Sequence, residues 1–315
     1  MITHFIHLCF SSYSEVMFRV HEDYIRGIND LIMASIKTDT TILAYALMSN
    51  HVHCCIQTKN DPKKLHRTFK ISYGRYFSAK YGRAGYIGDP EISVVEIEGY
   101  QHCLTAISYC LRNPLHHGVT GSCLNYPYSS ASAYFRESMG HGSFPATKLS
   151  CSRRLAPAHS VRPAGLRFES DGRASLDTSV DYRQVEMLFK TPAEFAYNML
   201  IRKSGKKWRE DQSDDNNDRD PVTLELLESD HFIVQEMERN ERLNFNVTDS
   251  SDIFICNIID NELVPLYEAE SVYHLSLDQQ LSAGHYLHSK YSCSMTQIAR
   301  CLAVREDAFF RLMQR

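Results

Sequence analysis

The sequence lacks three features that would each indicate a particular class of protein. It has no apolar run long enough to cross a bilayer, and its first residues, MITHFIHLCF, contain no basic region followed by an uncharged apolar segment. It also has no two cysteines separated by two residues, the usual spacing of a structural zinc site. We therefore expect a cytoplasmic protein without membrane spans and without such a zinc site.

The composition is that of an ordinary globular chain. Hydrophobic residues make up 43% and charged residues 23% of the 315 residues, which argues against a largely disordered protein. At this length two domains are the default expectation. The ten cysteines lie mostly within apolar segments, so we expect buried free thiols rather than disulfides.

Charge is unevenly distributed along the chain. The formal net charge is −4, yet the segment from 59 to 83 carries eight lysines and arginines against one aspartate. Such a segment is compatible with phosphate binding, and the alternative is a solvated helix face. Aromatic residues interleave with the basic ones, a mixture that can stack on bases. The candidate nucleic-acid contacts are Lys63, Lys64, Arg67, Lys70, Arg75, Arg83 and Arg112.

The most informative stretch is 47–56, LMSNHVHCCI, which sets two histidines at a spacing that a β-strand makes useful. Strand-forming residues flank Ser49 and Asn50, which predicts a hairpin with a two-residue loop. Strand side chains alternate between faces, so His51 and His53 should point to one side of the sheet, roughly 6.5–7 Å apart at the backbone. They could converge on a divalent metal; the alternative is a pair of surface histidines on a half-exposed strand.

The elements around the hairpin predict a small α+β domain. We expect a strand over 3–10, a helix over 21–36, hairpin strands over 41–48 and 51–57, a helix over 62–80, a strand over 92–97 and a helix over 100–113. Pro114 should end the last helix at Asn113, because the residue before a proline disfavours helical geometry. This order suits one antiparallel sheet with helices packed on its faces, a ferredoxin-like α+β fold.

The helix over 100–113 is the segment that we pair with the histidines. Tyr109 and Asn113 are four residues apart, so they project from the same side of a helix. Packing that helix beside the hairpin could bring a phenol and a metal to one phosphate. The alternatives are that Tyr109 serves packing alone and that Asn113 serves only as a helix stop.

Three ordered segments carry a resemblance to a known family. They are 44–53 (AYALMSNHVH), 72–77 with 83–86 (SYGRYF and RAGY), and 109–118 leading to 126–130 (YCLRNPLHHG and YPYSS). Through them, residues 2–135 resemble the single-tyrosine transposases of the HUH superfamily, especially the REP-associated tyrosine transposases.

The resemblance implies a site and a reaction. Tyr109 would be the nucleophile, and His51, His53 and Asn113 would bind a divalent metal, Mg²⁺ or Mn²⁺, of which Mn²⁺ suits the nitrogen ligands better. Attack on single-stranded or hairpin-bearing DNA would leave a 5′-phosphotyrosine and a free 3′-hydroxyl, and rejoining would need no ATP. Two other hypotheses stay open: a DNA-binding regulator that keeps the fold without catalysis, and a metal-dependent hydrolase without a covalent intermediate.

The rest of the chain is less informative. Residues 136–180 show no clear period and predict a linker between a nuclease domain over 1–135 and a mainly helical region over 181–315. Helices are expected over 181–208, 224–241 and 277–290. Residues 294–314 resemble a helix-turn-helix that would bind duplex DNA, and a plain helical hairpin is the alternative. The family contains both monomers and homodimers, and the sequence does not distinguish them.

Overall fold

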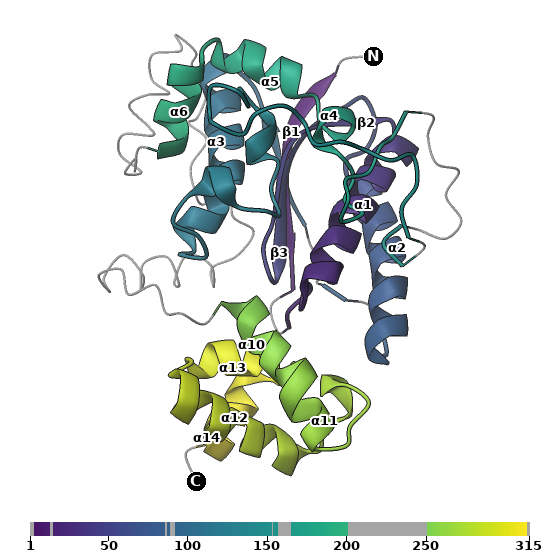
Figure 1. Ribbon diagram of the computed structural model, residues 1–315, viewed down its shortest axis with the longest axis vertical. Coiled ribbons are helices and arrows are strands. Elements are labelled where there is room, and N and C mark those ends of the chain that lie inside the picture. The colour runs from purple at the N-terminus through teal and green to yellow at the C-terminus, as the bar shows by residue number, and fades with distance from the viewer. Residues whose placement is uncertain are drawn as a thin grey trace.

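A four-stranded antiparallel sheet organises the N-terminal half of the protein (Figure 1). The computed structural model describes residues 3–12, 15–85, 87–88, 92–152, 154–156, 165–200 and 251–313. The strands β1 (His4–Ser11), β2 (Thr40–Leu47), β3 (His51–Thr58) and β4 (Ser93–Ile97) have the spatial order β2-β3-β1-β4. Helices α1 (His21–Lys37) and α2 (Lys63–Tyr81) lie between them in sequence, and α3 (Tyr100–His116) follows β4. This βαββαβ order is the ferredoxin-like plan, which confirms the predicted α+β fold.

The two faces of the sheet pack against different helices. Phe10 of β1 contacts His66 and Phe69 of α2, with ring centroids 4.9 and 5.1 Å apart. His7 lies three positions earlier and therefore on the opposite face, where its ring is 6.0 Å from that of Tyr109 on α3. Figure 1 shows α1 and α2 on one side of the sheet and α3 on the other. The candidate site consequently lies on the α3 side.

The predicted boundaries of these elements agree with the structure to within one residue, except at the end of α3. This helix continues to His116 with Pro114 inside it, so the prediction that it stops at Asn113 was wrong. Proline removes one backbone hydrogen bond and disfavours helical geometry in the preceding residue. Here Pro114 is buried and the Asn113 side chain is hydrogen-bonded to both hairpin histidines, so tertiary contacts outweigh the local preference.

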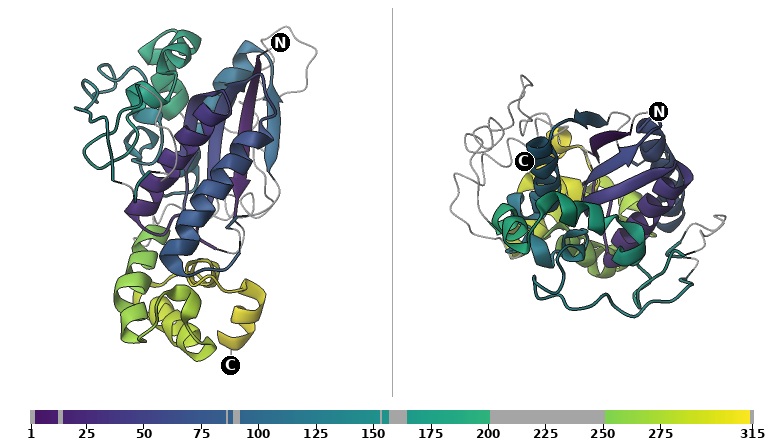
Figure 2. Two further views of the ribbon diagram at one scale, coloured as in Figure 1. Left: turned by 90° about the vertical axis from the view of Figure 1, so that its right-hand side faces the viewer. Right: turned by 90° about the horizontal axis from the view of Figure 1, so that it is seen from above.

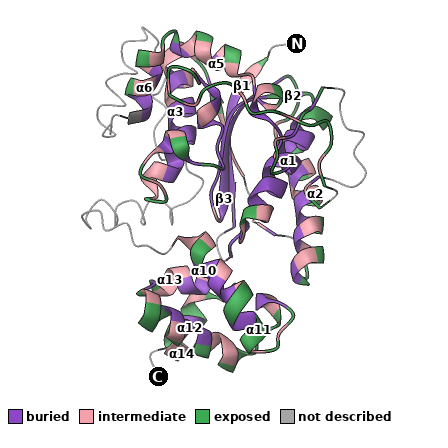
Figure 3. Ribbon diagram, in the orientation of Figure 1, coloured by how far each residue is buried: buried purple, intermediate pink, exposed green. Residues whose placement is uncertain are grey.

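The hairpin between β2 and β3 has the predicted two-residue loop. Its backbone is held by the segment that follows β1, because Met17 N donates to Ser49 O and Ser12 N donates to Asn50 O, both at 2.7 Å. Figure 3 shows β3 buried over most of its length, and Gln57 is its one partly exposed residue. These two hydrogen bonds hold the loop backbone immediately before His51, the first residue of β3.

Residues that follow α3 pack back against the sheet. Leu47 N donates to Tyr128 O and Asp181 N donates to Ile42 O, so the outer side of edge strand β2 is partly paired. Hydrophobic residues of α5 and α6 join the same core as the sheet. The elements in this region are Cys123–Asn125 and Ala131–Ala133 (3-10 turns), α4 (Leu176–Ser179), α5 (Tyr182–Phe189) and α6 (Pro192–Leu200).

Within the predicted linker, isolated bridges join Phe168 to Lys148 and to Ala174. Phe168 is itself buried in the core of the sheet domain. The division of the chain at residues 135 and 180 stays a prediction. The predicted helix over 224–241 and the end of the one over 181–208 lie outside the described residues.

A helical bundle with its own hydrophobic core forms the C-terminal region, as predicted. Figure 2 shows it at one end of the sheet. Residues 294–314 contain two short helices joined by a turn, and duplex DNA binding by them stays a prediction. The bundle comprises α10 (Asp252–Ile258), a π-helical turn (Ile259–Leu263), α11 (Val264–Leu266), a 3-10 turn (Val272–His274), α12 (Leu277–Tyr291), α13 (Met295–Cys301) and α14 (Glu306–Met313).

All ten cysteines are free thiols, as expected. None of the helices within the described ranges has both the length and the apolar character needed to cross a membrane.

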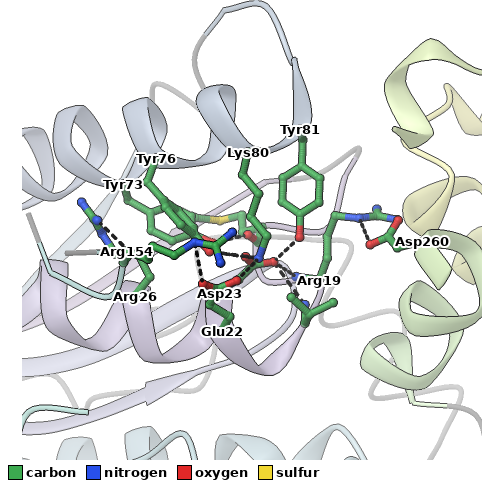
Figure 4. Close-up of polar contacts among 12 residues, drawn as sticks. Arg19, Glu22, Asp23, Arg26, Tyr73, Tyr76, Lys80, Tyr81, Arg154 and Asp260 are labelled. Atoms are coloured by element: carbon green, nitrogen blue, oxygen red, sulfur yellow. Dashed lines mark hydrogen bonds and ion pairs between the residues drawn. The ribbon is translucent and has the colours of Figure 1, made fainter. Parts of the chain in front are cut away.

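Asp23, in the first turn of α1, ties this end of α1 to α2 (Figure 4). Its buried carboxylate accepts hydrogen bonds from the hydroxyls of Tyr76 and Tyr81 at 2.8 and 2.7 Å and from Lys80 Nζ at 2.7 Å. It also accepts one from the backbone N–H of Arg19 at 3.0 Å, a group near the helix start that has no partner within the helix. The segment that carries Arg19 is thereby held in place.

Arg19 joins the sheet domain to the bundle. Its side chain is fully buried and donates from Nε and Nη2 to the two carboxylate oxygens of Asp260, at 3.0 and 2.6 Å (Figure 4). Nη1 donates to Cys301 O at 2.8 Å. Two guanidinium–carboxylate bonds in parallel fix orientation as well as distance.

Breaking this ion pair should destabilise the protein. Arg19→Met leaves the Asp260 carboxylate without its partner, and losing one partner of a buried ion pair costs about 3–5 kcal/mol. Because Asp260 keeps 16% of its side chain exposed, we expect the lower end of that range in urea denaturation. The double variant Arg19→Met/Asp260→Leu should recover most of the loss, since no charge is left unpaired. A single variant as stable as the unaltered protein would show that the pair does not hold the bundle.

Candidate active site

The hairpin and α3 bring four predicted site residues into one cluster. Asn113 Oδ1 lies 2.9 Å from His51 Nε2, and Asn113 Nδ2 lies 3.0 Å from His53 Nε2. The ring of Tyr109 is 5.4 Å from that of His53, at an angle of 87°. Strand alternation puts both imidazoles on the α3 side of β3, and one helical turn separates Tyr109 from Asn113. A phenol, two imidazoles and an amide therefore meet between one strand and one helix.

These four side chains are shielded from solvent. His51 is 2% exposed, and His53, Tyr109 and Asn113 are 0% exposed. The two histidines are thus not a surface pair. A polymeric substrate can reach Tyr109 only if some part of the protein moves.

Burial also determines the charge of the two hairpin histidines. It lowers the pKa of His51 to about 4. Burial, and then the neighbouring His51 and His7, lower the pKa of His53 well below its usual value. Both rings are therefore neutral near pH 7, which is the form of histidine that binds a metal.

The hydrogen-bond partners of His51 fit a nearby cation. A neutral imidazole has one N–H, but its Nδ1 lies 2.8 Å from Asn50 Oδ1 and its Nε2 lies 2.9 Å from Asn113 Oδ1. If Nδ1 donates to Asn50, the lone pair of Nε2 faces an amide oxygen, and a cation in contact with both atoms satisfies the arrangement. Exchanging the nitrogen and oxygen of the Asn50 or the Asn113 side-chain amide would also give both ring nitrogens of His51 a suitable partner. The geometry therefore fits a cation without requiring one.

The cluster contains the three side chains that the resemblance implies as metal ligands, and the metal itself stays a prediction. Two imidazole nitrogens and an amide oxygen suit Mn²⁺, and Mg²⁺ less well. In the part of the chain that the structure describes, no three His, Cys, Asp or Glu side chains are placed to hold a metal ion. The candidate ligands therefore remain His51, His53 and Asn113.

Sequence reasoning missed His7, which lies beside the site on β1. Its Nε2 is 3.2 Å from His53 Nδ1. The pairing of Cys9 with His53 in the β1–β3 ladder places the odd-numbered residues of β1 on the face of the site. The alternation of side chains along β1 predicts which of its residues share a face with His7. Only the strand order shows that this face adjoins the hairpin histidines.

His116 and His117, at the end of α3, also approach the site. The ring of His117 is 5.1 Å from that of His51, and the ring of His116 is 5.9 Å from that of Tyr109. Both residues are only partly exposed. They lie at the end of α3 because the helix continues past Pro114.

The helical bundle contacts the loop that leads into His51. Ser49 Oγ donates to Asp252 Oδ2 at 2.6 Å. The same carboxylate accepts from Arg300 Nε and Nη2, at 2.9 and 3.1 Å, and from Gln297 Nε2 at 3.0 Å. The Arg300 guanidinium is the main neighbour that keeps the pKa of the buried Asp252 below its usual value. The Asp252–Arg300 ion pair of the bundle therefore contacts Ser49, the residue before Asn50, and the Asn50 side chain contacts His51.

The seven candidate DNA contacts fall into two groups. Four face solvent on the outer side of α2, across the sheet from Tyr109: Lys63, Lys64, Arg67 and Arg75. The other three make contacts within the protein: Lys70 Nζ donates to Gly88 O at 3.1 Å, Arg83 Nε donates to Glu15 at 2.8 Å, and the buried Arg112 donates to Asn198 O at 3.2 Å.

The aromatic residues that interleave with the basic segment are not arranged to stack on bases. Tyr73, Phe77 and Tyr81 are buried in the core, and the Tyr76 hydroxyl bonds to Asp23. The expectation of base stacking at these residues was wrong, because their helical spacing directs them toward α1 and the sheet.

Comparison with known proteins gives similarity to solved structures alone. No protein-family model matches the chain, and no curated protein matches it. Among solved structures, a REP-associated tyrosine transposase bound to a REP hairpin matches with a TM-score of 0.35 and 17% sequence identity. The match covers 48% of this chain and 88% of that one. A likeness at this level carries no argument about activity.

Acid should destabilise the protein between about pH 6.5 and pH 4. Burial lowers the pKa of His7 to about 3 and those of His51 and His66 to about 4. The unfolded chain binds protons at these residues near pH 6.5, so the free energy of unfolding should fall as the pH drops through this window and change little above it. Urea midpoints measured from pH 8 to pH 4 test this. His66→Phe should reduce the pH dependence, and a midpoint that stays constant down to pH 4.5 would contradict the assignment of neutral buried rings.

Proposed function

We propose that this protein is a metal-dependent DNA nicking-and-rejoining enzyme of the transposase type, which acts on single-stranded, hairpin-bearing DNA through a covalent bond to Tyr109. The observation that carries the proposal is the placement of the Tyr109 ring 5.4 Å from His53, beside an amide shared by two neutral imidazoles. Nucleophile and ligands come from β3 and α3, which fixes their relative positions.

His51, His53 and Asn113 would hold the cation. When bound, a divalent cation neutralises charge on a phosphodiester and orients it for attack. None of the three candidate ligands carries a negative charge. A DNA phosphate would therefore complete the site, and we expect cation and DNA each to raise the affinity for the other.

Tyr109 supplies the attacking oxygen. A bond forms between its phenolic oxygen and phosphorus while the bond from phosphorus to the 3′ oxygen breaks. The phenol loses its proton, and the departing oxygen gains one to become a 3′-hydroxyl. The phosphotyrosine ester retains the free energy of the broken bond, so the reverse attack by a 3′-hydroxyl rejoins strands.

Labelled single strands with hairpins of varied sequence test the proposal. With Mn²⁺ present, a label at the 3′ end should remain with the protein in a denaturing gel, because Tyr109 would hold the 5′ end of the downstream fragment. A label at the 5′ end should leave on a strand that ends in a 3′-hydroxyl. Cleavage without a protein-bound strand would instead identify a hydrolase.

A second candidate is a DNA-binding regulator that keeps the fold without catalysis. The complete burial of Tyr109 favours it, since a regulator needs no route to that side chain. Hairpin binding without cleavage in Mn²⁺, across the whole set of strands, would support this function over the enzyme.

The outer side of α2 is the candidate surface for the DNA backbone. The triple variant Lys64→Ala/Arg67→Ala/Arg75→Ala should weaken hairpin binding and lower the slope of log affinity against log salt by about 2 to 3, since each phosphate contact contributes roughly 0.7–0.9. A filter-binding or anisotropy titration from 50 to 300 mM salt, with these concentrations as approximate limits, measures this slope.

A control variant removes two exposed charges elsewhere on the surface, with Arg183→Ala/Lys190→Ala on and beside α5. It should leave the slope unchanged. Equal slopes for the α2 variant and the unaltered protein would place the DNA elsewhere.

A further inference from the structure

We infer that His7 is a positioning residue that fixes the tautomer of His53, and so decides which ring nitrogen of His53 faces the cation site. The inference rests on the proposed function, because it concerns the same site. Nothing in the sequence pattern paired this histidine with the hairpin.

The contact joins two fully buried rings on neighbouring strands. His7 and His53 are both 0% exposed, and His7 Nε2 lies 3.2 Å from His53 Nδ1. Their ring centroids are 5.3 Å apart with 31° between the planes. His7 pairs with Cys55 and Cys9 pairs with His53 in the ladder, so the two histidines are diagonal neighbours on one face.

The hydrogen bonds assign the protons along this chain of groups. With the Asn113 amide oriented as in the structure, Nδ2 donates to His53 Nε2 at 3.0 Å, so Nε2 accepts and carries a lone pair, and Cys9 Sγ lies 3.7 Å from the same nitrogen. The proton of a neutral His53 is then on Nδ1, which donates to His7 Nε2. The proton of His7 is left on its own Nδ1, a buried atom with no hydrogen-bond partner in the described part of the protein. Such atoms are uncommon and call for an explanation.

The assigned tautomer is the one that a metal ligand needs. A histidine that binds through Nε2 must carry its proton on Nδ1, and proteins secure this with an acceptor at Nδ1. His7 provides that acceptor. Without it, the proton of His53 can move to Nε2. If the Asn113 amide then reverses, this N–H donates to the Asn113 oxygen, and neither atom is available to a cation.

An uncharged acceptor has a further consequence. A carboxylate at this position would raise the basicity of His53 more strongly and tighten cation binding. An imidazole holds the same tautomer with less effect on the basicity of His53.

The test compares two substitutions of His7 with one of a neighbouring histidine. His7→Phe removes the acceptor, whereas His7→Gln places an amide oxygen near the position of Nε2. His4→Phe is the matched control, because His4 lies on the same strand, is partly exposed and pairs with Glu96. Mn²⁺ alone is the probe, titrated without DNA and followed by calorimetry or by the loss of the free-ion electron paramagnetic resonance signal.

We expect His7→Phe to weaken Mn²⁺ binding by roughly 10- to 100-fold, as is typical of such outer partners. His7→Gln and His4→Phe should stay close to the unaltered protein. Mn²⁺ binding by His7→Phe equal to that of His4→Phe would overturn the inference.

The tautomer is also measurable in the unaltered protein, so the test does not depend on variants that fold. Long-range ¹H–¹⁵N spectra at pH 7.5, with the signals of His53 assigned through His53→Gln, should show its proton on Nδ1 in the absence of metal. A proton on Nε2 would refute the positioning role. Neither measurement involves DNA cleavage, so a failure to find a covalent adduct would reject the proposed function and leave this inference standing.

Discussion

Tyr109→Phe should abolish covalent capture of DNA, lowering the rate of adduct formation by at least about 10⁴-fold, because the substitution removes the attacking oxygen and little else. Hairpin binding should be nearly unchanged, since the substitution removes a single uncharged oxygen and leaves the basic side chains on the outer side of α2 in place. The measurement is the yield of protein-bound, 3′-labelled strand with time in Mn²⁺.

Tyr45→Phe is the matched control. Tyr45 is also fully buried, lies on the opposite face of the sheet, and has a hydroxyl without a hydrogen-bond partner in the described ranges. Its loss should leave both stability and adduct formation close to those of the unaltered protein. An adduct that forms at the normal rate in Tyr109→Phe would remove Tyr109 from the role of nucleophile.

Loss of a histidine ligand should have the second largest effect. His53→Ala removes one nitrogen of the cation site, and Lewis-acid stabilisation is worth several kcal/mol, so we expect a decrease of about 10³-fold in adduct formation. Chelation of divalent cations should do the same to the unaltered protein, and added Mn²⁺ should restore it.

His66→Phe controls for the loss of a buried neutral histidine. His66 lies on α2, across the sheet from the site, and its ring packs against Phe10. Adduct formation that persists in His53→Ala and in the presence of chelator would show that the chemistry does not use a cation at this place.

The position of the helical bundle bears on both predictions. It lies at the end of the sheet where β3 begins, and its Asp252 bonds to Ser49 in the loop before His51. The same loop accepts backbone hydrogen bonds from Ser12 and Met17. Any movement that admits DNA to Tyr109 has to leave this loop in place, or the ligand geometry is lost with it.

Local patterns predicted the parts of the site that local structure determines. The turn formers Ser49 and Asn50 gave the register of the hairpin, and period-2 alternation put His51 and His53 on one face. Helical spacing put Tyr109 and Asn113 on one side of α3. The cluster could be predicted because each half depends on residues within a few positions of each other.

What the sequence could not provide depends on distant contacts. The helix continues through Pro114 because Asn113 is held by two histidines some sixty positions earlier. His7 joins the site only because β1 lies beside β3 in the sheet. The Arg19–Asp260 pair links positions 241 residues apart, and no periodic pattern carries that information.

The basic segment shows the limit of composition. Its charge was evident, but the distribution between solvent and interior was not. Lys70 and Arg83 bond to protein partners, whereas Lys64 and Arg67 face outward on α2. A count of charges along the chain cannot distinguish inward-facing from outward-facing residues, because it contains no information on which side of each helix is buried.

The most direct test of the account is to locate the covalent bond. The protein–DNA adduct formed with a hairpin-bearing single strand and Mn²⁺ is digested with nuclease and protease, and the peptides are sequenced by mass spectrometry. The convergence of Tyr109 with His51, His53 and Asn113 predicts a nucleotide phosphate on the oxygen of Tyr109. A nucleotide on any other residue, or strands cleaved without any modified peptide, would contradict it.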